Sequence, residues 1–545
     1  MTDNGPGQQP SLAKASGSMA IASLVSRITG FVRQVLLVGV IGIGAVNDSY
    51  TVSNNLPNIV YELLLGGVLA SVVIPVLVRA QTEDSDGGDA FAQRLLTVAC
   101  VVLAIGTVIA VACAPLLTRL YFSGSGSGGG SGSDNPALTT AFSYLILPEI
   151  LFYGIFGLLS GILNARHVFK PAAWAPVLNN VVMFATLAVY ALVPGEISLN
   201  PVKMGSAKVL VLGVGTTLGV VLQAAVLVPP LRRIGFRFRP RWGWDKRLST
   251  FGRLSAWLIA YTLVSQVAYV ELTKIATGAE TGSMTIYSNS WLLLQVPYGV
   301  LGVSLLTAIM PRLSRAAATG DLPGVVDNLS TGSRLSAVML IPLCGLITVL
   351  GPEIGVALFS IRSSQSGNAV ELGLSLTTSA FGLVFYAITM LQLRVFYAMN
   401  DARTPTVINA IMVVVKLVLF VGCAHFLDPH HRVYGLTFVN ALGFLVAAVI
   451  GEVWLRNRIG ALDTGRVVRT IIKSAVAAAW GGAGALLVTK GLDLAFPGSL
   501  HLRAWLALIL GSLVGLGLSF AVMAVLRMAE VKPVVRRLSA LTRRG

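Results

Sequence analysis

Long apolar stretches limit what this chain can fold into more strongly than any other feature of its sequence. Each exceeds about 18 residues, close to the roughly 20 residues that a helix needs to cross a bilayer. Only 12% of the 545 residues are charged, which excludes an ordinary soluble protein. We expect an all-α, polytopic membrane protein with fourteen spanning helices, at about residues 19–43, 53–78, 95–118, 138–163, 173–194, 208–231, 252–277, 284–310, 326–351, 373–397, 407–427, 434–455, 468–489 and 502–527.

The charges of the loops predict how these helices are oriented. The chain carries 40 basic and 23 acidic residues, a net charge of +17. Most basic residues fall in loops and tails on the same side of the membrane as the N-terminus. By the positive-inside rule this side is the cytoplasm, so we expect both termini there. The basic surplus then reflects topology and contact with lipid headgroups, and we expect no nucleic-acid partner.

The sequence carries no recognisable catalytic or metal-binding motif. Cys100, Cys113, Cys344 and Cys423 lie in apolar runs without CxxC spacing, which argues against a disulfide framework and a zinc site. Walker A, HExxH and GxSxG patterns are also absent from the sequence. We therefore expect a transporter that is not an enzyme, with no resident cofactor or metal.

Two pairs of similar segments predict an internal repeat. PVLVRA at 75–80 resembles PRLSRA at 311–316, and NARHVFKP at 164–171 resembles NDARTP at 400–405, with the same spacing in both pairs. Each pair lies six helices apart, so the two lobes share an orientation and are related by an axis along the membrane normal. The predicted parts are a disordered tail at 1–18, an N-lobe at 19–231, a basic inter-lobe loop at 232–251, a C-lobe at 252–455, two extra helices at 468–527 and a basic cytoplasmic tail at 528–545. Residues 123–133, only serine and glycine, resemble an engineered linker.

Arg27 and Arg33 are the most informative polar residues within the predicted helices. From a helix start near residue 19 they lie about 12 and 21 Å deep, within a hydrocarbon core about 30 Å thick. An arginine there costs at least about 2.5 kcal/mol, so we expect both to face a hydrated cavity. They share a helix face only if Gly30 allows a bend. Guanidinium groups suit phosphate, which predicts an anionic substrate; the alternative is structural pairing with Asp48 or Glu62.

Other polar residues within the helices extend this candidate site. The amides of Asn54, Asn55 and Asn58 either contact a sugar or peptide part of a ligand or serve helix packing. Gln266, Glu271 and Lys274 lie on one helix, where Glu271 and Lys274 either neutralise one another or leave Glu271 to bind a coupling ion or proton. Arg394 and Lys416 either line the second lobe or pack near helix ends.

Several separated motifs resemble the MurJ/MviN family of lipid II flippases, within the multidrug/oligosaccharidyl-lipid/polysaccharide exporter superfamily. They are SRITGFVRQ (26–34), NDSYTVSNNLPN (47–58), GILNARHVFKPAAWAPVLNN (161–180), QVPYGVLGVSLLTAIMP (295–311) and RVFYAMNDARTP (394–405). The resemblance spans about residues 11–528. It implies fourteen helices, two lobes around a cationic cavity, and a groove formed with the last two helices that takes an undecaprenyl tail.

The resemblance also assigns residues to the substrate site. The essential arginines of the family's first helix fall on Arg27 and Arg33, and its following acidic residue falls on Asp48. Departures occur where many relatives have an arginine pair and this chain has Tyr61 and Glu62. We therefore expect either that Lys274, Arg394 or Lys416 compensates or that the headgroup is held differently. Glu271, Asn409 and Asn440 are the candidates for a coupling ion.

We thus expect a flippase in a bacterial, and by resemblance actinobacterial, plasma membrane. Its partners would be lipid II and membrane lipids, together with a cytoplasmic regulatory region or partner, and the chain would act as a monomer. A Na⁺ or H⁺ gradient or the membrane potential would drive transport. The alternative is a cation-coupled multidrug or polysaccharide-lipid exporter of the same superfamily.

Overall fold

The computed structural model describes most of the chain. The described residues are 12–62, 74–122, 135–197, 199, 206–243, 252–360, 366–399, 401–496 and 498–531. The Gly/Ser stretch at 123–133 lies outside them, as do most of the N- and C-terminal tails and residues 244–251 of the inter-lobe loop.

The described residues are overwhelmingly helical, as the apolar stretches predict. Within the described part of the chain, ten helices are long and apolar enough to cross a membrane, or eleven if the pair 367–379 and 382–398, bent by 54°, forms one span. The predicted number of fourteen is not reached for identifiable reasons. The predicted stretch 53–78 includes residues outside the described part, and the stretch 284–310 contains a π-helical turn, Tyr298–Gly302. The helix at 252–277 contains Gln266, Glu271 and Lys274, which make it less apolar.

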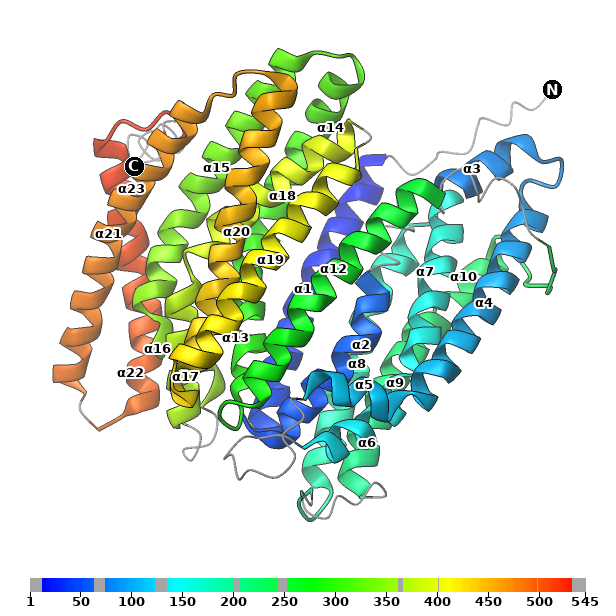
Figure 1. Ribbon diagram of the computed structural model, residues 1–545, viewed down its shortest axis with the longest axis horizontal. Helices are drawn as coiled ribbons and strands as arrows, with labels where there is room; N and C mark the ends of the chain where they lie inside the picture. The colour runs from blue at the N-terminus through cyan, green and yellow to red at the C-terminus, as the bar shows by residue number, and fades with distance from the viewer. Residues whose placement is uncertain are drawn as a thin grey trace, which may run out of the picture. The chain divides into compact units, whose positions relative to one another are not determined.

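The chain divides into two compact units. Unit 1 comprises residues 1–40, 49–120 and 135–262, and unit 2 comprises residues 41–48, 121–134 and 263–545. The two helices at the C-terminus therefore cluster with the second unit. The helices that lie wholly or mainly in unit 1 (Figure 1) are α1 (Leu12–Ile41), α2 (Ala45–Glu62), α3 (Ile74–Glu83), α4 (Asp89–Ala112), α5 (Ala114–Tyr121), α6 (Pro136–Ile146), α7 (Glu149–Ala165), α8 (Lys170–Leu192), α9 (Ala207–Ala225) and α10 (Val228–Arg233).

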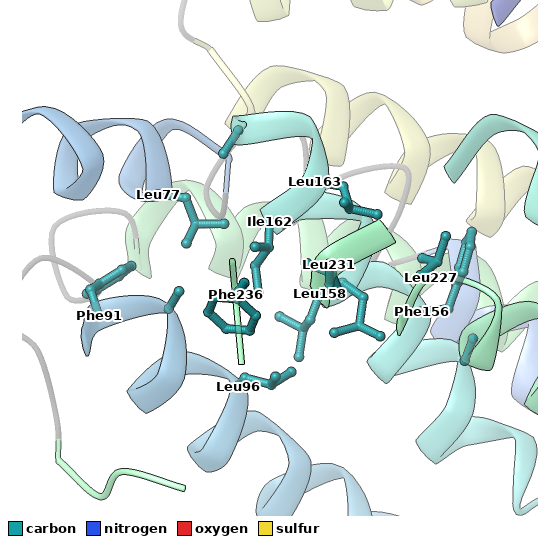
Figure 2. Packing of buried hydrophobic residues seen from close by; sticks show 14 of the residues in the cluster. Leu77, Phe91, Leu96, Phe156, Leu158, Ile162, Leu163, Leu227, Leu231 and Phe236 are labelled. Atoms are coloured by element: carbon teal, nitrogen blue, oxygen red, sulfur yellow. The ribbon is translucent and has the colours of Figure 1, made fainter. Parts of the chain in front are cut away.

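The core of unit 1 forms where α3, α4, α7 and α10 meet. Figure 2 shows Leu77 of α3, Phe91 of α4, Ile162 of α7 and Phe236 after α10 turned toward a common interior. At the same end of α7, Arg166 forms an ion pair with Asp89 and its guanidinium lies 5.5 Å from the centre of the Phe236 ring. Apolar packing and one ion pair thus fix the C-terminal end of α7.

Unit 2 contains the remaining helices. They are α12 (Gly252–Thr277), which begins in unit 1, α13 (Ser283–Pro297), η2 (Tyr298–Gly302), α14 (Val303–Ala318), α15 (Leu322–Val349), α16 (Gly351–Phe359), α17 (Ser366–Ser379), α18 (Gly382–Ala398), α19 (Arg403–Phe426), α20 (Pro429–Ile459), α21 (Thr464–Ala495), α22 (Leu500–Leu506), η4 (Ala507–Gly511) and α23 (Ser512–Val525). α21 packs against α15 on one side and α23 on another, as Figure 1 shows.

Glycines set the spacing between α21 and α23. A Cβ atom at Gly481 would overlap the carbonyl oxygen of Gly515 and the hydroxyl of Ser519. Small residues let two helix backbones approach closely and gain van der Waals contact where lipid offers no hydrophobic driving force. The last two spans therefore form a tightly packed pair.

The two sequence motifs NARHVFKP and NDARTP form similar turns. After α7, the N–H of Val168 donates to the carbonyl of Leu163 at 2.8 Å. After α18, the N–H of Asp401 donates to the carbonyl of Phe396 at 2.9 Å. Both bonds span five residues, as in the Schellman motif that ends many helices. The bonds fall on different positions of the two motifs, the fifth residue of NARHVFKP and the second of NDARTP, so the shared type of turn does not by itself support the repeat.

Candidate functional site

Arg27 and Arg33 both lie on α1, which runs without interruption through Gly30. Arg27 is exposed and Arg33 is half-buried. Six residues correspond to about 240° around a regular helix, so the two side chains leave α1 on different sides. α1 is not broken at Gly30, so no break in the helix brings the two side chains onto one face.

The segment of α1 between these arginines is held by Asn180 of α8. The Asn180 side-chain amide donates to the hydroxyl of Thr29 at 2.8 Å and to the backbone carbonyl of Ser26 at 3.2 Å. A Cβ atom at Gly30 would lie 3.7 Å from the Asn180 amide nitrogen, so α1 and α8 approach closely there. Asn180 ends one of the family motifs, and this anchoring role was not predicted from the sequence.

Arg33 belongs to a polar cluster inside unit 1, which consists of Arg33, Tyr50, Glu149, Thr216 and Thr217. Arg33 acts electrostatically on both Tyr50 of α2 and Glu149 of α7. The Tyr50 hydroxyl lies 3.2 Å from the hydroxyl of Thr216 on α9. Glu149 is completely buried. Sequence reasoning missed Glu149, although it is the only acidic residue in the predicted span 138–163 and such residues commonly mark functional sites.

Asn54, Asn55 and Asn58 of α2 are half-buried. The Asn58 amide donates to the carbonyl of Asn54 at 2.8 Å, and its oxygen accepts the Tyr153 hydroxyl at 3.4 Å. The amide nitrogen of Asn55 is buried and has no hydrogen-bond partner in the described part of the chain. Asn58 thus serves contacts within unit 1, whereas Asn55 has an unused donor. The side chain of Glu62 lies outside the described residues.

Asp48 caps a distant helix in unit 2. Its carboxylate accepts the backbone N–H groups of Gly282 and Thr285, each at 2.8 Å, and the Thr285 hydroxyl at 2.6 Å. These groups form the N-terminus of α13, where unsatisfied N–H donors and the helix dipole favour a negative charge. The side chain is only 2% exposed. This geometry favours a structural role for Asp48 over direct contact with a substrate.

Two of the three candidate coupling-ion residues of unit 2, Glu271 and Asn440, contact lysine side chains. Lys274 pairs with Glu271 at 3.6 Å, as their spacing on α12 predicts. Lys416 is buried and donates to the Asn440 side-chain oxygen at 2.9 Å. Asn409 donates to the hydroxyl of Ser265 at 2.9 Å. Oxygens of Glu271 and Asn440 that could bind a cation are therefore already matched by ammonium groups.

The surroundings of Lys416 explain how a charge is accommodated there. Its ammonium lies 4.4 Å from the centre of the Phe444 ring, a cation–π contact. Its methylene chain occupies the space where a side chain at Gly443 would begin. Arg394, by contrast, is exposed, and the buried side-chain oxygen of Gln266 has no hydrogen-bond partner among the described residues.

Two apolar cavities lie beside α21 in unit 2. One, of about 290 Å³, lies among α15, α18, α20 and α21, and the other, of about 450 Å³, lies among α15, α18 and α21. They share Phe385 and Ile471 as lining residues. A third cavity, of about 570 Å³, shares Val326 and Asp463 with the first and includes Asp327 and Arg466. These cavities form a track along α21 with polar groups at one end.

Glu280, Glu371 and His430 form a further cluster in unit 2. One ligand atom from each lies within 4.8 Å of the others, close enough to surround a metal ion. His430 Nδ1 lies 3.1 Å from Glu280 and 3.7 Å from Glu371. Sequence reasoning made no claim on His430, because its two carboxylate neighbours come from distant parts of the chain.

Comparison with known proteins identifies the family. A family model described as lipid II flippase MurJ matches residues 37–504. The chain belongs to the MurJ family. A probable lipid II flippase MurJ of Rhizobium meliloti is 27% identical over 86% of each chain. One of Vibrio cholerae is 26% identical over 75% of this chain and 77% of its own. The family inferred from the sequence motifs is thus confirmed.

Solved structures confirm the fold. A lipid II flippase MurJ in an inward closed conformation has a TM-score of 0.70 and 18% identity, covering 94% of this chain and 99% of its own. An inward-facing multidrug resistance MATE transporter of the MOP superfamily has a TM-score of 0.62 and 15% identity, covering 82% and 99%. The chain is therefore a multi-pass, all-α membrane protein of a flippase family. The multidrug exporter that the sequence left as an alternative is not the family matched.

Proposed function

We propose that this chain moves lipid II, the undecaprenyl-diphosphate-linked peptidoglycan precursor, from the cytoplasmic to the outer leaflet by alternating access. Membership of a lipid II flippase family supports the substrate. Translocation changes no covalent bond, so the chain needs no catalytic residues. What it needs is a group that holds the charged headgroup and a path that keeps the tail in apolar surroundings.

Arg33 is the observation that carries the headgroup assignment. It is a half-buried cation on α1, a helix that is long and apolar enough to cross a membrane. A charge inside a membrane-spanning helix is energetically costly, and the residues that carry one usually mark functional sites. A guanidinium forms two parallel hydrogen bonds with phosphate oxygens and remains charged at any physiological pH. Arg27 supplies a second cation on the same helix, and Asn180 keeps this part of α1 in place.

The other predicted site residues are polar groups that belong to one unit or the other. Gln266, Lys274, Arg394 and Lys416 add polar groups in unit 2, although Lys274 and Lys416 have partners within the protein. Asn54, Asn55, Asn58 and Glu62 add polar groups on α2. Asp48 contributes through the fold, because its carboxylate is bound to the start of α13.

The apolar cavities beside α21 support the path for the tail. Most of their lining residues are aliphatic or aromatic and come from α15, α18 and α21, with α20 added in the smaller cavity, where Gln392, Glu452 and Asp463 are polar exceptions. Hydrocarbon prefers such surroundings by about 25 cal/mol for each Å² removed from water. The cavities lie beside the first of the two C-terminal spans, and α23 packs on α21 without lining either cavity.

We infer the membrane arrangement from charge and sequence. Both termini lie in the cytoplasm of a bacterial cell, as the loop charges predict, and the chain works as a monomer. A gradient of H⁺ or the membrane potential drives the cycle. A proton suits this chain better than Na⁺, because lysine ammonium groups already contact Glu271 and Asn440.

Rescue of a bacterium depleted of its own lipid II flippase tests the proposal. We expect the wild-type chain to restore growth and to relieve the accumulation of lipid II in the inner leaflet. Arg27→Ala and Arg33→Ala should each fail, whereas Arg33→Lys should retain part of the activity because it keeps the charge but loses the two-pronged geometry.

The matched control is Arg315→Ala, which removes an exposed arginine near the end of α14. It should rescue as well as the wild type. Full rescue by both alanine variants at Arg27 and Arg33 would contradict the headgroup assignment. Failure of the wild type in a closely related host, with normal membrane insertion, would contradict the flippase function itself.

A further inference from the structure

Glu280, Glu371 and His430 form a cluster in unit 2 that the proposed function does not use. Glu280 lies in the turn between α12 and α13, Glu371 lies on α17, and His430 lies in the first turn of α20. One potential ligand atom from each residue lies within 4.8 Å of the other two. Three elements that are far apart in the chain therefore bring three metal-binding groups to one point.

The distances around His430 fit a tetrahedral zinc site. Its Nδ1 atom lies 3.1 Å from Oε2 of Glu280 and 3.7 Å from Oε1 of Glu371. Zinc binds histidine nitrogen and carboxylate oxygen at about 2.0–2.2 Å, so a tetrahedron places neighbouring ligand atoms about 3.3–3.6 Å apart. Movements of a few tenths of an ångström would bring both distances into this range.

The direction from which the carboxylates approach favours a metal over a proton. A protonated Nδ1 carries one hydrogen, which points at a single acceptor. Both carboxylates nevertheless approach this same nitrogen. A metal ion placed among the three groups would meet the lone pair of the neutral nitrogen and both carboxylates at once. The convergence on one atom is thus better used by a cation than by an N–H group.

A nearby arginine is engaged elsewhere. Arg432, two residues after His430, donates to the backbone carbonyls of Leu427 at 3.2 Å and Gly278 at 3.5 Å. In the part of the chain that the structure describes, the ion pairs of Glu280 and Glu371 are both with His430. No lysine or arginine there matches the two negative charges, and a divalent cation would balance them.

Contacts outside the cluster hold its backbone in place. Two residues after Glu280, the N–H of Gly282 donates to the Asp48 carboxylate at 2.8 Å. At the start of α20 the N–H of His431 donates to the carbonyl of Asp428 at 2.9 Å. α17 packs against both α13 and α20. Ligands that stand on elements already fixed by other contacts lose less freedom when they bind an ion.

The ligand types select the metal. Imidazole nitrogen suits zinc and other late transition metals, whereas Mg²⁺ and Ca²⁺ prefer shells made of oxygen alone. Three protein ligands with a water molecule at the fourth position are typical of open zinc sites. His430 is exposed, so both the ion and the water can reach the cluster from solvent.

We propose that Glu280, Glu371 and His430 bind one Zn²⁺ ion, with water as the fourth ligand. The ion joins the turn between α12 and α13 to α17 and α20, and so holds these helix ends of unit 2 together. The loop charges predict that these ends face the outside of the cell. The site has no part in the proposed headgroup binding and does not depend on it.

A zinc titration tests the site directly. The full-length chain, without a histidine tag and freed of metal by a chelator, would be placed in phospholipid nanodiscs and titrated with zinc chloride against a chromophoric zinc chelator. We expect the wild type to bind one Zn²⁺ at this site, and an excess of Mg²⁺ or Ca²⁺ should not displace it. Zinc should also raise the unfolding temperature, because it binds the folded chain.

Variants of the ligands should lose this binding. We expect Glu280→Gln and His430→Ala each to weaken zinc binding at least about tenfold and to abolish the rise in unfolding temperature. His425→Ala is the matched control for the imidazole, because His425 is also exposed and lies near the end of α19. Asp428→Asn is the control for negative charge, because it removes an exposed carboxylate two residues before His430. Both controls should bind zinc as the wild type does.

X-ray absorption on the zinc-loaded wild type tests the ligands without any variant. It should show nitrogen and oxygen ligands at about 2.0–2.2 Å, with the scattering of one imidazole ring. A shell of oxygen alone would contradict the site. Absence of saturable zinc binding, or unchanged binding by folded Glu280→Gln and His430→Ala, would overturn it and leave an ion pair of His430 only. None of these results bears on the flippase, which the rescue of depleted cells tests separately.

Discussion

Asp48 accepts a hydrogen bond from the backbone N–H of Thr285 at 2.8 Å, although the two residues are 237 positions apart in the chain. The bond joins the first turn of α2 to the first turn of α13. α2 begins four residues after the end of α1. Both Asp48 and Thr285 belong to unit 2. A short segment near the N-terminus is thus part of the unit built mainly from the second half of the chain.

This capping interaction predicts a large effect of Asp48→Ala on stability. The change leaves the N–H groups of Gly282 and Thr285 without their acceptor at a buried helix end. We expect a loss of about 2 kcal/mol or more, measured as a lower thermal unfolding temperature in detergent. Asp48→Asn keeps one oxygen acceptor and should lose less. Equal stability of Asp48→Ala and wild type would show that the cap contributes nothing.

A bulky side chain in the cavity beside α21 should block transport without unfolding the protein. Ala479 is exposed and lines the cavity of about 450 Å³, which is large enough to receive an indole ring. We expect Ala479→Trp to reduce rescue of flippase-depleted cells strongly, because the ring occupies the path proposed for the lipid tail. Leu487→Trp is the control, since Leu487 is 72% exposed and lines neither cavity beside α21. Normal rescue by Ala479→Trp would contradict this path.

Asp401, in the turn between α18 and α19, predicts a pH-dependent contribution to stability. Burial raises the pKa of its carboxyl group, but hydrogen bonds from Thr404 and the charge of Arg458 outweigh this effect and hold the pKa below its usual value. A depressed pKa in the folded state stabilises the fold above the unfolded value of about 3.9, and this stabilisation is lost as pH falls through the folded pKa.

We therefore expect Asp401→Asn to lower the unfolding temperature at neutral pH. The difference from the wild type should shrink as the pH is lowered below about 4. Scanning calorimetry or intrinsic fluorescence at several pH values measures this. A difference that stays constant through acid pH would mean that the charge of Asp401 is not what stabilises the turn.

Lys416 and Gly443 should be energetically coupled. A Cβ atom at Gly443 would overlap the methylene chain of Lys416, so Gly443→Ala must displace Lys416 from Asn440. We expect a loss of about 1–3 kcal/mol, typical of overpacking. The double variant Gly443→Ala/Lys416→Ala should be less destabilised than the sum of the single variants, because the overlap is gone. Additive losses in thermal unfolding would contradict this contact.

The apolar stretches predicted the helical segments well because hydrophobicity and length alone define a membrane span. The number of fourteen spans stays a prediction, because the described residues do not cover every predicted span and hydropathy does not reveal where a span is interrupted. Such interruptions are the π-helical turn at Tyr298–Gly302 and the short gap between α6 and α7 at Leu147 and Pro148.

The candidate site was predictable only in its residue types. Charges within apolar stretches indicated Arg33, Glu271, Lys274 and Lys416, and their spacing predicted the Glu271–Lys274 pair. The sequence could not show that Asp48 caps α13 or that Asn180 holds α1, because these partners are far apart in the chain. Glu149 carried a readable signal, an isolated carboxyl group in an apolar span, but its cationic neighbour becomes visible only in the fold.

The glycine contact between α21 and α23 has a mechanical consequence. With backbone against backbone at Gly481 and Gly515, the two helices have no side chains between them that could change rotamer and open a gap. An acyl chain that enters this region must therefore separate α21 from α15 and α18, where the cavities lie, and not from α23. The two C-terminal helices would then move together as one unit.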